Sequence, residues 1–438
     1  MPAPPDPPPA RRAAERIVRT LRDAGHVAYF AGGCVRDELL GLEPSDYDVA
    51  TDATPDQVTA LFPRSGEVGK SFGVVIVRLP DIRGEVVEVA TFRTDDSYSD
   101  RRRPDRVRFS TPEDDARRRD FTVNALFLDP FGLPMPGAPA PRFGGAIIDY
   151  VGGLDDLRTR RLAAVGDPDA RLDEDHLRAL RGARLAARLG FELAPATADA
   201  IRRHAPALAG VSRERIGDEV RRILAHPTRA RGVALLRDLC LEPTVLDQPA
   251  SLDCPAGPDN SPNAFPRLAG LPYAASTGLC LAAWALDRGL DPADPGAAAQ
   301  IARWRGALCL SNDERDELAA TLRLVALLRE PWAGLGVAPR KRAAASPAFP
   351  GALALVALEN PDLGARLRAD VDALAASAGG IAPEPLLTGD DLIALGASPG
   401  PAFRRVLDAV YDAQLEGRLK NPEQARAMAR ELIPTPGV

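Results

Sequence analysis

The chain has 438 residues, of which 45% are hydrophobic and 26% are charged, and its formal net charge is −6. This length exceeds one ordinary hydrophobic core and predicts two to four domains. No apolar run reaches the roughly eighteen residues of a membrane span, so we expect no membrane protein. The five cysteines are scattered without a C-x-x-C pair, which argues against a disulfide framework and a structural zinc site.

The distribution of positive charge is more informative than the negative sum. Nearly all basic residues are arginines, whose planar forks suit phosphates and base edges. A genome rich in G and C would replace lysine by arginine everywhere, but it would not cluster the arginines. The clusters lie at Arg101–Arg103, Arg117–Arg119, Arg158–Arg161 and Arg213–Arg222.

The N-terminal third alternates between predicted helices and strands. The proline-rich residues 1–10 lack the pattern of a signal peptide, and we expect a disordered tail and a cytoplasmic protein. Residues 11–24 predict an amphipathic helix that ends at Gly25. Strands are predicted at 27–31, 47–50, 73–79 and 85–92, with a short helix at 34–40. Residues 122–128 fit either a strand or a helix, because a short apolar run does not decide between them.

From Glu174 onward the pattern is helical almost to the end of the chain. Residues 247–275 interrupt it with many Pro, Ser, Asn and Gly residues, which indicates a linker or a long loop. Later helices are predicted at 313–329, 362–376 and 402–416. The fold class is therefore α+β, with a mixed β-sheet and helices first and an all-α part after them.

The chemistry of the N-terminal part centres on two carboxylates. Asp46 and Asp48 are two apart, so in a strand both side chains point to the same face. Two neighbouring anions repel each other unless a cation lies between them, and Mg²⁺ prefers carboxylate oxygens together with substrate phosphates. Two such ions could clamp the attacking and leaving oxygens of a phosphoryl transfer. Taken alone, the pair also fits two solvated surface carboxylates.

A glycine pair precedes these carboxylates. Gly32 and Gly33 stand at a predicted helix start, where backbone N–H groups can approach a triphosphate. Arg36, one turn further, could add a charged fork. A glycine pair before a helix is usually only a tight turn, but its combination with Asp46 and Asp48 is far more specific.

The full pattern resembles the polymerase-β-type nucleotidyltransferase superfamily, and within it the class II CCA-adding enzymes and bacterial poly(A) polymerases. The likeness fades past Leu241 and returns weakly at Gly389–Leu419. It rests on segments in the same order along the chain: Gly32–Gly41, Ser45–Pro55, Glu88–Arg93, Arg117–Leu126, Ile148–Leu157 and Glu174–Arg181.

The resemblance implies a division of the chain. It predicts a disordered tail at 1–10, a nucleotidyltransferase catalytic head at 11–165 and a helical neck with a base-reading helix at 166–245. A linker or long loop would follow at 246–275, and a helical body and tail that bind tRNA at 276–438.

The resemblance also implies roles for single residues in the head. Asp46 and Asp48 match the metal ligands, and Gly33 and Arg36 match triphosphate contacts. Three further positions match a nucleotide-binding arginine and two residues that brace the site around the sugar, namely Arg119, Asp120 and Asn124. Glu88, on a valine-rich strand, is either a third catalytic carboxylate or the partner of a structural salt bridge with Arg93 or another arginine.

A predicted helix that opens at Asp173 and Glu174 carries charged residues every three positions, namely Asp175, Arg178, Arg181 and Arg184. Such a stripe is usually an exposed charged face. The resemblance instead implies that Asp175 and Arg178 select the base and that Arg181 and Arg184 add nucleotide contacts. A carboxylate that accepts from an exocyclic amine, beside an arginine that donates to the ring, would admit cytosine and adenine and reject uracil and guanine.

The predicted function is template-independent addition of CCA to the 3′ end of tRNA from CTP and ATP, with Mg²⁺ as cofactor and no membrane partner. The rivals are a poly(A) polymerase, an enzyme that adds only CC or only A, and a non-catalytic RNA-binding relative. Residues 69–75 (Gly-Lys-Ser-Phe-Gly-Val-Val) resemble tRNA enzymes more than poly(A) polymerases. The sequence leaves the oligomeric state open.

Overall fold

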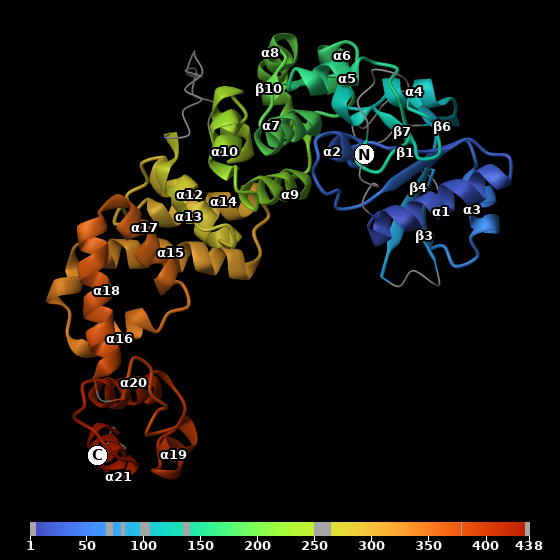
Figure 1. Ribbon diagram of the computed structural model, residues 1–438. Coiled ribbons are helices and arrows are strands. Elements are labelled where there is room, and N and C mark those ends of the chain that lie inside the picture. The colour runs from blue at the N-terminus through green and yellow to red at the C-terminus, as the bar shows by residue number, and fades with distance from the viewer. Residues whose placement is uncertain are drawn as a thin grey trace. The chain divides into compact units, whose positions relative to one another are not determined.

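In the computed structural model, the described residues form two compact units (Figure 1). The first comprises residues 1–220 and 235–258, and the second comprises residues 221–234 and 259–438. None of the described helices combines the length and the apolar character that crossing a bilayer requires. The structure describes residues 6–66, 73–79, 84–96, 106–134, 141–248, 264–377 and 379–433. The arginines at 101–103, the proline-rich residues 1–5, most of the predicted linker (249–263) and residues 69–72 lie outside them.

The first unit is built on a six-stranded sheet in the order β3-β4-β2-β1-β7-β8. Neighbouring strands are antiparallel except β2 and β4, which run parallel, so the sheet is mixed and the α+β prediction is confirmed. The strands are β1 (Ala28–Ala31), β2 (Asp48–Thr51), β3 (Val74–Arg78), β4 (Val86–Thr91), β7 (Phe127–Asp129) and β8 (Ala146–Ile148). Two small ladders pair β5 (Arg93–Asp96) with β6 (Arg106–Phe109), and β9 (Arg161–Leu162) with β10 (Glu192–Leu193).

The two faces of the sheet are covered differently. Helices α1 (Pro9–Asp23) and α3 (Pro55–Leu61) pack on one face, where buried side chains such as Ile17, Phe30 and Val49 form the larger core (Figure 1). The other face carries a smaller core of residues such as Ala50, Phe92, Ala116 and Phe127, with Ala116 supplied by α4 (Pro112–Arg117). Because side chains alternate along a strand, Asp48 shares the second face with Ala50.

Residues 122–128, which fit a helix or a strand, contain both. A single 3₁₀ turn spans Thr122–Asn124, and β7 begins at Phe127. The other helices with residues in the first unit are α2 (Gly33–Leu39), α5 (Gly153–Arg158), α6 (Pro168–Glu174), α7 (Leu177–Leu189), α8 (Pro195–His204), α9 (Arg213–Leu224), α10 (Arg229–Asp238) and α11 (Glu242–Val245).

The predicted start of a helix at Asp173 and Glu174 is wrong. Both residues belong to the last turn of α6, whose start is fixed earlier by the Asp167 cap and Pro168. Asp175 is extended, with φ −155° and ψ 104°, and α7 begins only at Leu177. Asp175 therefore lies in a connection between two helices, and the charged stripe of α7 holds only the arginines.

The second unit is helical throughout its described part. Buried Trp284 and Trp304 lie with their ring centroids 5.4 Å apart in its core. The helices predicted at 313–329, 362–376 and 402–416 coincide with α15, α18 and α20. The helices are α12 (Pro266–Gly270), α13 (Thr277–Asp287), α14 (Ala297–Ala307), α15 (Asn312–Arg329), α16 (Val337–Ala344), α17 (Phe349–Glu359), α18 (Pro361–Ala376), α19 (Gly389–Ala394), α20 (Pro401–Leu415) and α21 (Pro422–Leu432).

The cysteines differ from the sequence-based expectation at one position. Cys34 and Cys280 are buried thiols and Cys309 is exposed, but Cys240 is disulfide-bonded. The sequence argued against a disulfide framework, and the disulfide at Cys240 departs from that expectation.

Candidate active site

A cavity of about 590 Å³ lies in the first unit. It brings together every predicted site residue except Glu88. Its walls are formed by Gly32, Gly33, Arg36, Asp37, Ser45, Asp46, Asp48, Arg118, Arg119, Asp120, Asn124, Asp175, Leu177, Arg178, Arg181, Arg184, Leu185, Arg188 and Arg215.

The two aspartates reach the cavity because Tyr47 between them points the other way. Tyr47 is 1% exposed and packs edge-on against Phe30, with ring centroids 5.4 Å apart. Alternation along the chain then turns Asp46 and Asp48 to the opposite side. Both line the cavity, as their spacing predicted.

The carboxylates repel each other in the structure. Burial, together with the charges of Asp46 and Glu88, raises the pKa of Asp48 to about 7, although the charge of Arg119 opposes the rise. Among the described residues neither Asp46 nor Asp48 has an ion-pair partner. This excess of negative charge fits a divalent cation, whose preferred ligands are carboxylate oxygens.

Glu88 lies beside Asp48 on the neighbouring strand. The parallel pairing of β2 with β4 aligns Val49 with Val89, so Asp48 and Glu88 occupy equivalent places on the same face. Glu88 is exposed, and no ion pair joins it to an arginine that the structure describes. The geometry favours a carboxylate that adds charge to the pair over a structural salt bridge.

The turn into α2 requires glycine at its first position. Gly32 has φ +80°, and a Cβ there would lie 2.9 Å from the Nη1 atom of Arg119. The Gly32 N–H donates to the carbonyl oxygen of Leu126 at 3.1 Å. The N–H of Gly32 is therefore used within the fold, and the predicted triphosphate contact of the glycine pair depends on Gly33.

Arg36 lines the cavity but is 3% exposed. Its guanidinium donates to the Oδ1 atom of Asp37 at 2.7 and 2.8 Å, and its Nη1 donates to the side-chain oxygen of Asn124. Arg36 thus ties the start of α2 to the 3₁₀ turn that carries Asn124.

Arg119 follows the end of α4 and is held in place by Asp115, a buried acid of that helix. Its Nε and Nη2 atoms donate to Asp115 at 3.1 and 2.9 Å, and Nη1 donates to the backbone oxygen of Asn124 at 3.1 Å. The guanidinium also lies over the ring of Phe127, 5.1 Å from its centroid. These contacts fix the fork at the side of the cavity that holds Asp48.

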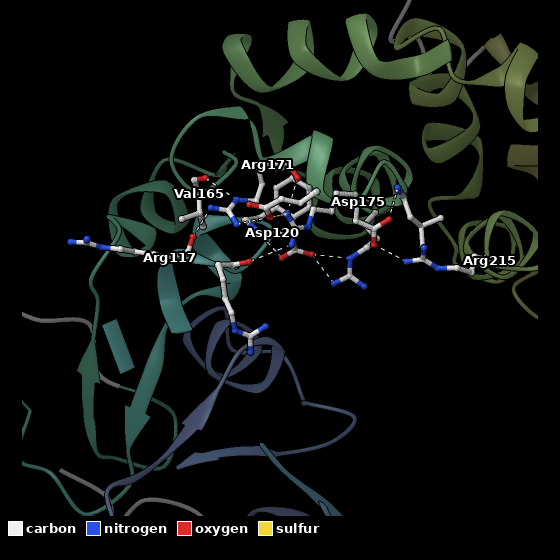
Figure 2. A network of polar contacts seen from close by, with 12 residues as sticks. Arg117, Asp120, Val165, Arg171, Asp175 and Arg215 are labelled. Carbon is white, nitrogen blue, oxygen red and sulfur yellow. Dashed lines mark hydrogen bonds and ion pairs between the residues drawn. The ribbon is translucent and has the colours of Figure 1, made fainter. Parts of the chain in front are cut away.

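Asp120 joins the head to α7. Its Oδ2 accepts from the Nε and Nη2 atoms of Arg181 at 2.8 and 2.6 Å, and its Oδ1 accepts from the Asn124 side chain at 3.1 Å (Figure 2). Burial by itself would raise the pKa of Asp120, but the charge of Arg181 and these hydrogen bonds outweigh it and lower the pKa to about 2. Asp120 and Asn124 are therefore partners, although no α-helix joins them.

The connection between α6 and α7 is held at Asp175. Its Oδ1 accepts from the Leu177 N–H at 3.0 Å, and its Oδ2 accepts from Arg215 of α9 at 2.7 Å (Figure 2). Arg178 pairs with Glu174 and donates to the carbonyl oxygen of Arg171 at 2.7 Å. Arg171 in turn donates to the carbonyl oxygen of Arg117 at 2.6 Å, which ties this connection to α4.

The α7 arginines continue past the predicted ones. Arg184 donates to buried Glu219 at 2.6 Å, and Arg188 donates to Asp37 at 3.2 Å. The sequence analysis missed Arg188 as a cavity residue, although its spacing of four from Arg184 continues the stripe. It also missed Arg215 and Asp37, although Arg215 belongs to the arginine cluster at 213–222 and Asp37 lies in the segment Gly32–Gly41.

Comparisons with known proteins agree with this geometry. Residues 28–163 match the family described as "Poly A polymerase head domain", and residues 190–248 match "Probable RNA and SrmB- binding site of polymerase A". The chain is 44% identical to the CCA-adding enzyme of Bacillus pumilus (strain SAFR-032) over 221 residues, which are 50% of this chain and 51% of that enzyme. In that match the chain spans about half the length of its relative.

Two further matches extend over nearly the whole chain. Identity to the CCA-adding enzyme of Limosilactobacillus fermentum (strain NBRC 3956 / LMG 18251) is 33% over 420 residues, 94% of each chain. The crystal structure of the Bacillus stearothermophilus CCA-adding enzyme in complex with CTP superposes with a TM-score of 0.72 at 29% identity, covering 97% of this chain and 98% of that one.

Proposed function

Because the chain belongs to the family of CCA-adding enzymes, we propose that it adds C and A nucleotides from CTP and ATP to the 3′ end of tRNA without a nucleic-acid template. One observation carries the proposal: a single cavity joins the carboxylate pair Asp46 and Asp48 to an arginine-lined wall that ends at Asp175. The first part suits phosphoryl transfer, and the second suits recognition of a nucleotide.

The carboxylates would hold divalent cations, which we expect to be Mg²⁺ because carboxylate oxygens, together with substrate phosphates, are its preferred ligands. Bound there, such ions supply positive charge to the in-line attack of a 3′-hydroxyl on an α-phosphate, with release of pyrophosphate. Glu88 would add negative charge to the same set of ligands.

Arginines of the chain would hold the nucleotide. Arg119, fixed by Asp115 and Phe127, points its fork to the side of the cavity nearest Asp48, where a triphosphate would lie. Asp120 and Asn124 line the part of the cavity where a sugar would bind. Arg36 donates to Asn124 and would therefore hold this part of the cavity at a fixed position relative to α2, which begins at Gly33.

Asp175 and Arg178 would read the base. A carboxylate offers about four acceptor positions, and the Leu177 N–H and Arg215 fill two of those on Asp175. An exocyclic amine of cytosine or adenine can take one of the others, whereas the carbonyl of uracil or guanine would face the carboxylate and leave it unpaired. Arg181 and Arg184 would add contacts along α7.

Incorporation of each labelled nucleotide tests the proposal. We expect CTP to enter tRNA that ends in the discriminator base or in that base plus C, and ATP to enter tRNA that ends in CC. Long ATP runs on any RNA would instead indicate a poly(A) polymerase, and C or A alone would indicate a specialised enzyme. RNA binding without incorporation would leave a non-catalytic relative. The cytoplasmic location stays a prediction.

A further inference from the structure

The chain contains only four histidines, and the structure brings two of them together outside the cavity. His176 lies just before α7, and His204 is the last residue of α8. Their rings lie with centroids 5.6 Å apart. Asp173, in the last turn of α6, joins them, and one ligand atom from each of the three residues lies within 4.8 Å of the others.

The contacts of His204 leave the lone pair of one ring nitrogen available to a metal ion. Its Nε2 lies 3.1 Å from Asp169, which is ion-paired with Arg203 at 2.6 Å and so remains an ionised acceptor. The proton of a neutral imidazole then sits on Nε2, and the lone pair of Nδ1 faces the carboxylate of Asp173 at 3.5 Å. A carboxylate that orients a histidine through its second nitrogen is the usual arrangement behind metal-ligating histidines.

We infer that Asp173, His176 and His204 form a binding site for a divalent transition-metal ion, and that this ion is Zn²⁺. The site is distinct from the carboxylates of the cavity. Two imidazoles and one carboxylate suit Zn²⁺, whereas Mg²⁺ prefers oxygen ligands alone. Asp169 acts as the positioning residue of His204. The remaining coordination position would be open to water.

The location gives such an ion a structural effect. Helices α6 and α8 already pack against each other, and the ion would join their ends to the connection that carries Asp175. His176 is 2% exposed, so its ring cannot leave the protein without local unfolding. Metal binding therefore restrains the segment next to Asp175 and raises the thermal stability of the first unit.

The competing explanation is a plain charge pair between protonated His204 and its two aspartates. It predicts no stabilisation by metal. Direct metal binding separates the two explanations.

The test uses the full chain without a histidine tag, freed of metal by a chelator and kept in excess Mg²⁺ to occupy the cavity carboxylates. Zn²⁺ is titrated by calorimetry, and Co²⁺ is titrated by its visible absorption as a tetrahedral probe. We expect one equivalent of tightly bound Zn²⁺, a tetrahedral Co²⁺ spectrum and a higher melting temperature with Zn²⁺.

Variants locate the ion. Asp173→Asn and His204→Gln should abolish the high-affinity equivalent, and Asp173 is exposed enough for its variant to fold. Asp169→Asn should weaken binding by about 10- to 100-fold, as loss of an orienting carboxylate does elsewhere. The matched controls, Asp199→Asn on α8 and His226→Gln in the second unit, should bind as the unchanged protein does.

Two outcomes would overturn the site. One is the absence of a bound equivalent of Zn²⁺ in the unchanged protein. The other is a bound equivalent that survives Asp173→Asn and His204→Gln but disappears in Asp46→Ala, which would place the ion in the cavity. Neither result depends on nucleotide transfer, so the site and the proposed function fail separately.

Discussion

The two charged regions of the site differ in whether their side chains form ion pairs within the chain. The carboxylate corner, defined as Asp46 and Asp48 in the cavity with Glu88 beside Asp48, holds acids with no ion-pair partner among the described residues. The arginine wall pairs every cation with an acid of the chain. Its pairs are Arg36–Asp37, Arg118–Asp115, Arg119–Asp115, Arg178–Glu174, Arg181–Asp120, Arg184–Glu219, Arg188–Asp37 and Arg215–Asp175.

This difference shows how the protein prepares each part. The paired arginines are held in fixed positions before a ligand arrives, so little side-chain freedom is lost on binding. The unpaired carboxylates repel one another, and burial together with this repulsion raises the pKa of Asp48 to about 7. Arg119 offsets part of the repulsion, and a cation from outside the chain would offset more of it. Folding therefore fixes the arginines of the wall, whereas the carboxylate corner would be completed by the divalent cations proposed above.

The largest effect is expected from breaking the carboxylate corner. Asp46→Ala or Asp48→Ala removes a metal ligand for which the corner has no substitute, so turnover should fall below a few per cent of its original value. Circular dichroism should show an unchanged fold. A variant that keeps more turnover than this would refute the assignment of the metal site to Asp46 and Asp48.

The next largest effect should come from the arginine wall. Arg181→Met leaves buried Asp120 without its cation, which should cost about 3 kcal/mol of unfolding free energy at pH 7. With Arg181 present the folded pKa of Asp120 lies below its unfolded value, so its stabilisation is complete above about pH 4 and is lost as pH falls toward 2.

Denaturant titrations of both proteins across that pH range measure this coupling. The difference between them should shrink as the pH falls, because a protonated Asp120 no longer needs a cation. Arg161→Met, which removes an exposed partner of Asp156, is the matched control and should cost less. A difference that does not change with pH would mean that Arg181 stabilises through packing.

Base selection offers a smaller effect at the end of the wall. Asp175→Asn presents an amide that can offer either a donor or an acceptor, so UTP should enter where CTP did and GTP where ATP did. A bidentate pair is worth about 1–3 kcal/mol, so the preference for CTP over UTP should fall by about ten- to a hundredfold. Competition between the two nucleotides on tRNA lacking its 3′ end measures the ratio, and an unchanged ratio would exclude Asp175 from base reading.

The smallest expected effect is on the stability of the metal-free protein. A folded pKa of about 7 for Asp48 lies above its unfolded value, so without metal the folded state binds the extra proton and loses stability as pH rises from about 4 to 7. Asp48→Asn should therefore stabilise the metal-free protein at pH 8 by on the order of 1 kcal/mol. Melting curves with a chelator should show the gain, and excess Mg²⁺ should reduce it. Equal melting temperatures of the two proteins with the chelator would contradict a destabilising charge on Asp48.

Local patterns predicted much of the site. The alternation of Asp46, Tyr47 and Asp48 by itself places both acids opposite the larger core. The positive φ at Gly32 is a property that glycine supplies without strain. The helix predicted at 313–329 is α15, whose start the side chains of Ser311 and Glu314 cap reciprocally. These features depend on residues within one or two turns of each other.

The sequence by itself determined the α+β class, the face that carries the two acids and the arginine stripe of α7. The tertiary structure alone decided that Glu88 lies beside Asp48, that Arg215 reaches Asp175 across 40 positions and that His176 meets His204. The physical reason is that local periodicity fixes which face a side chain occupies. The neighbour it meets there depends on which strands pair and which helix ends pack together, and those choices come from the fold as a whole.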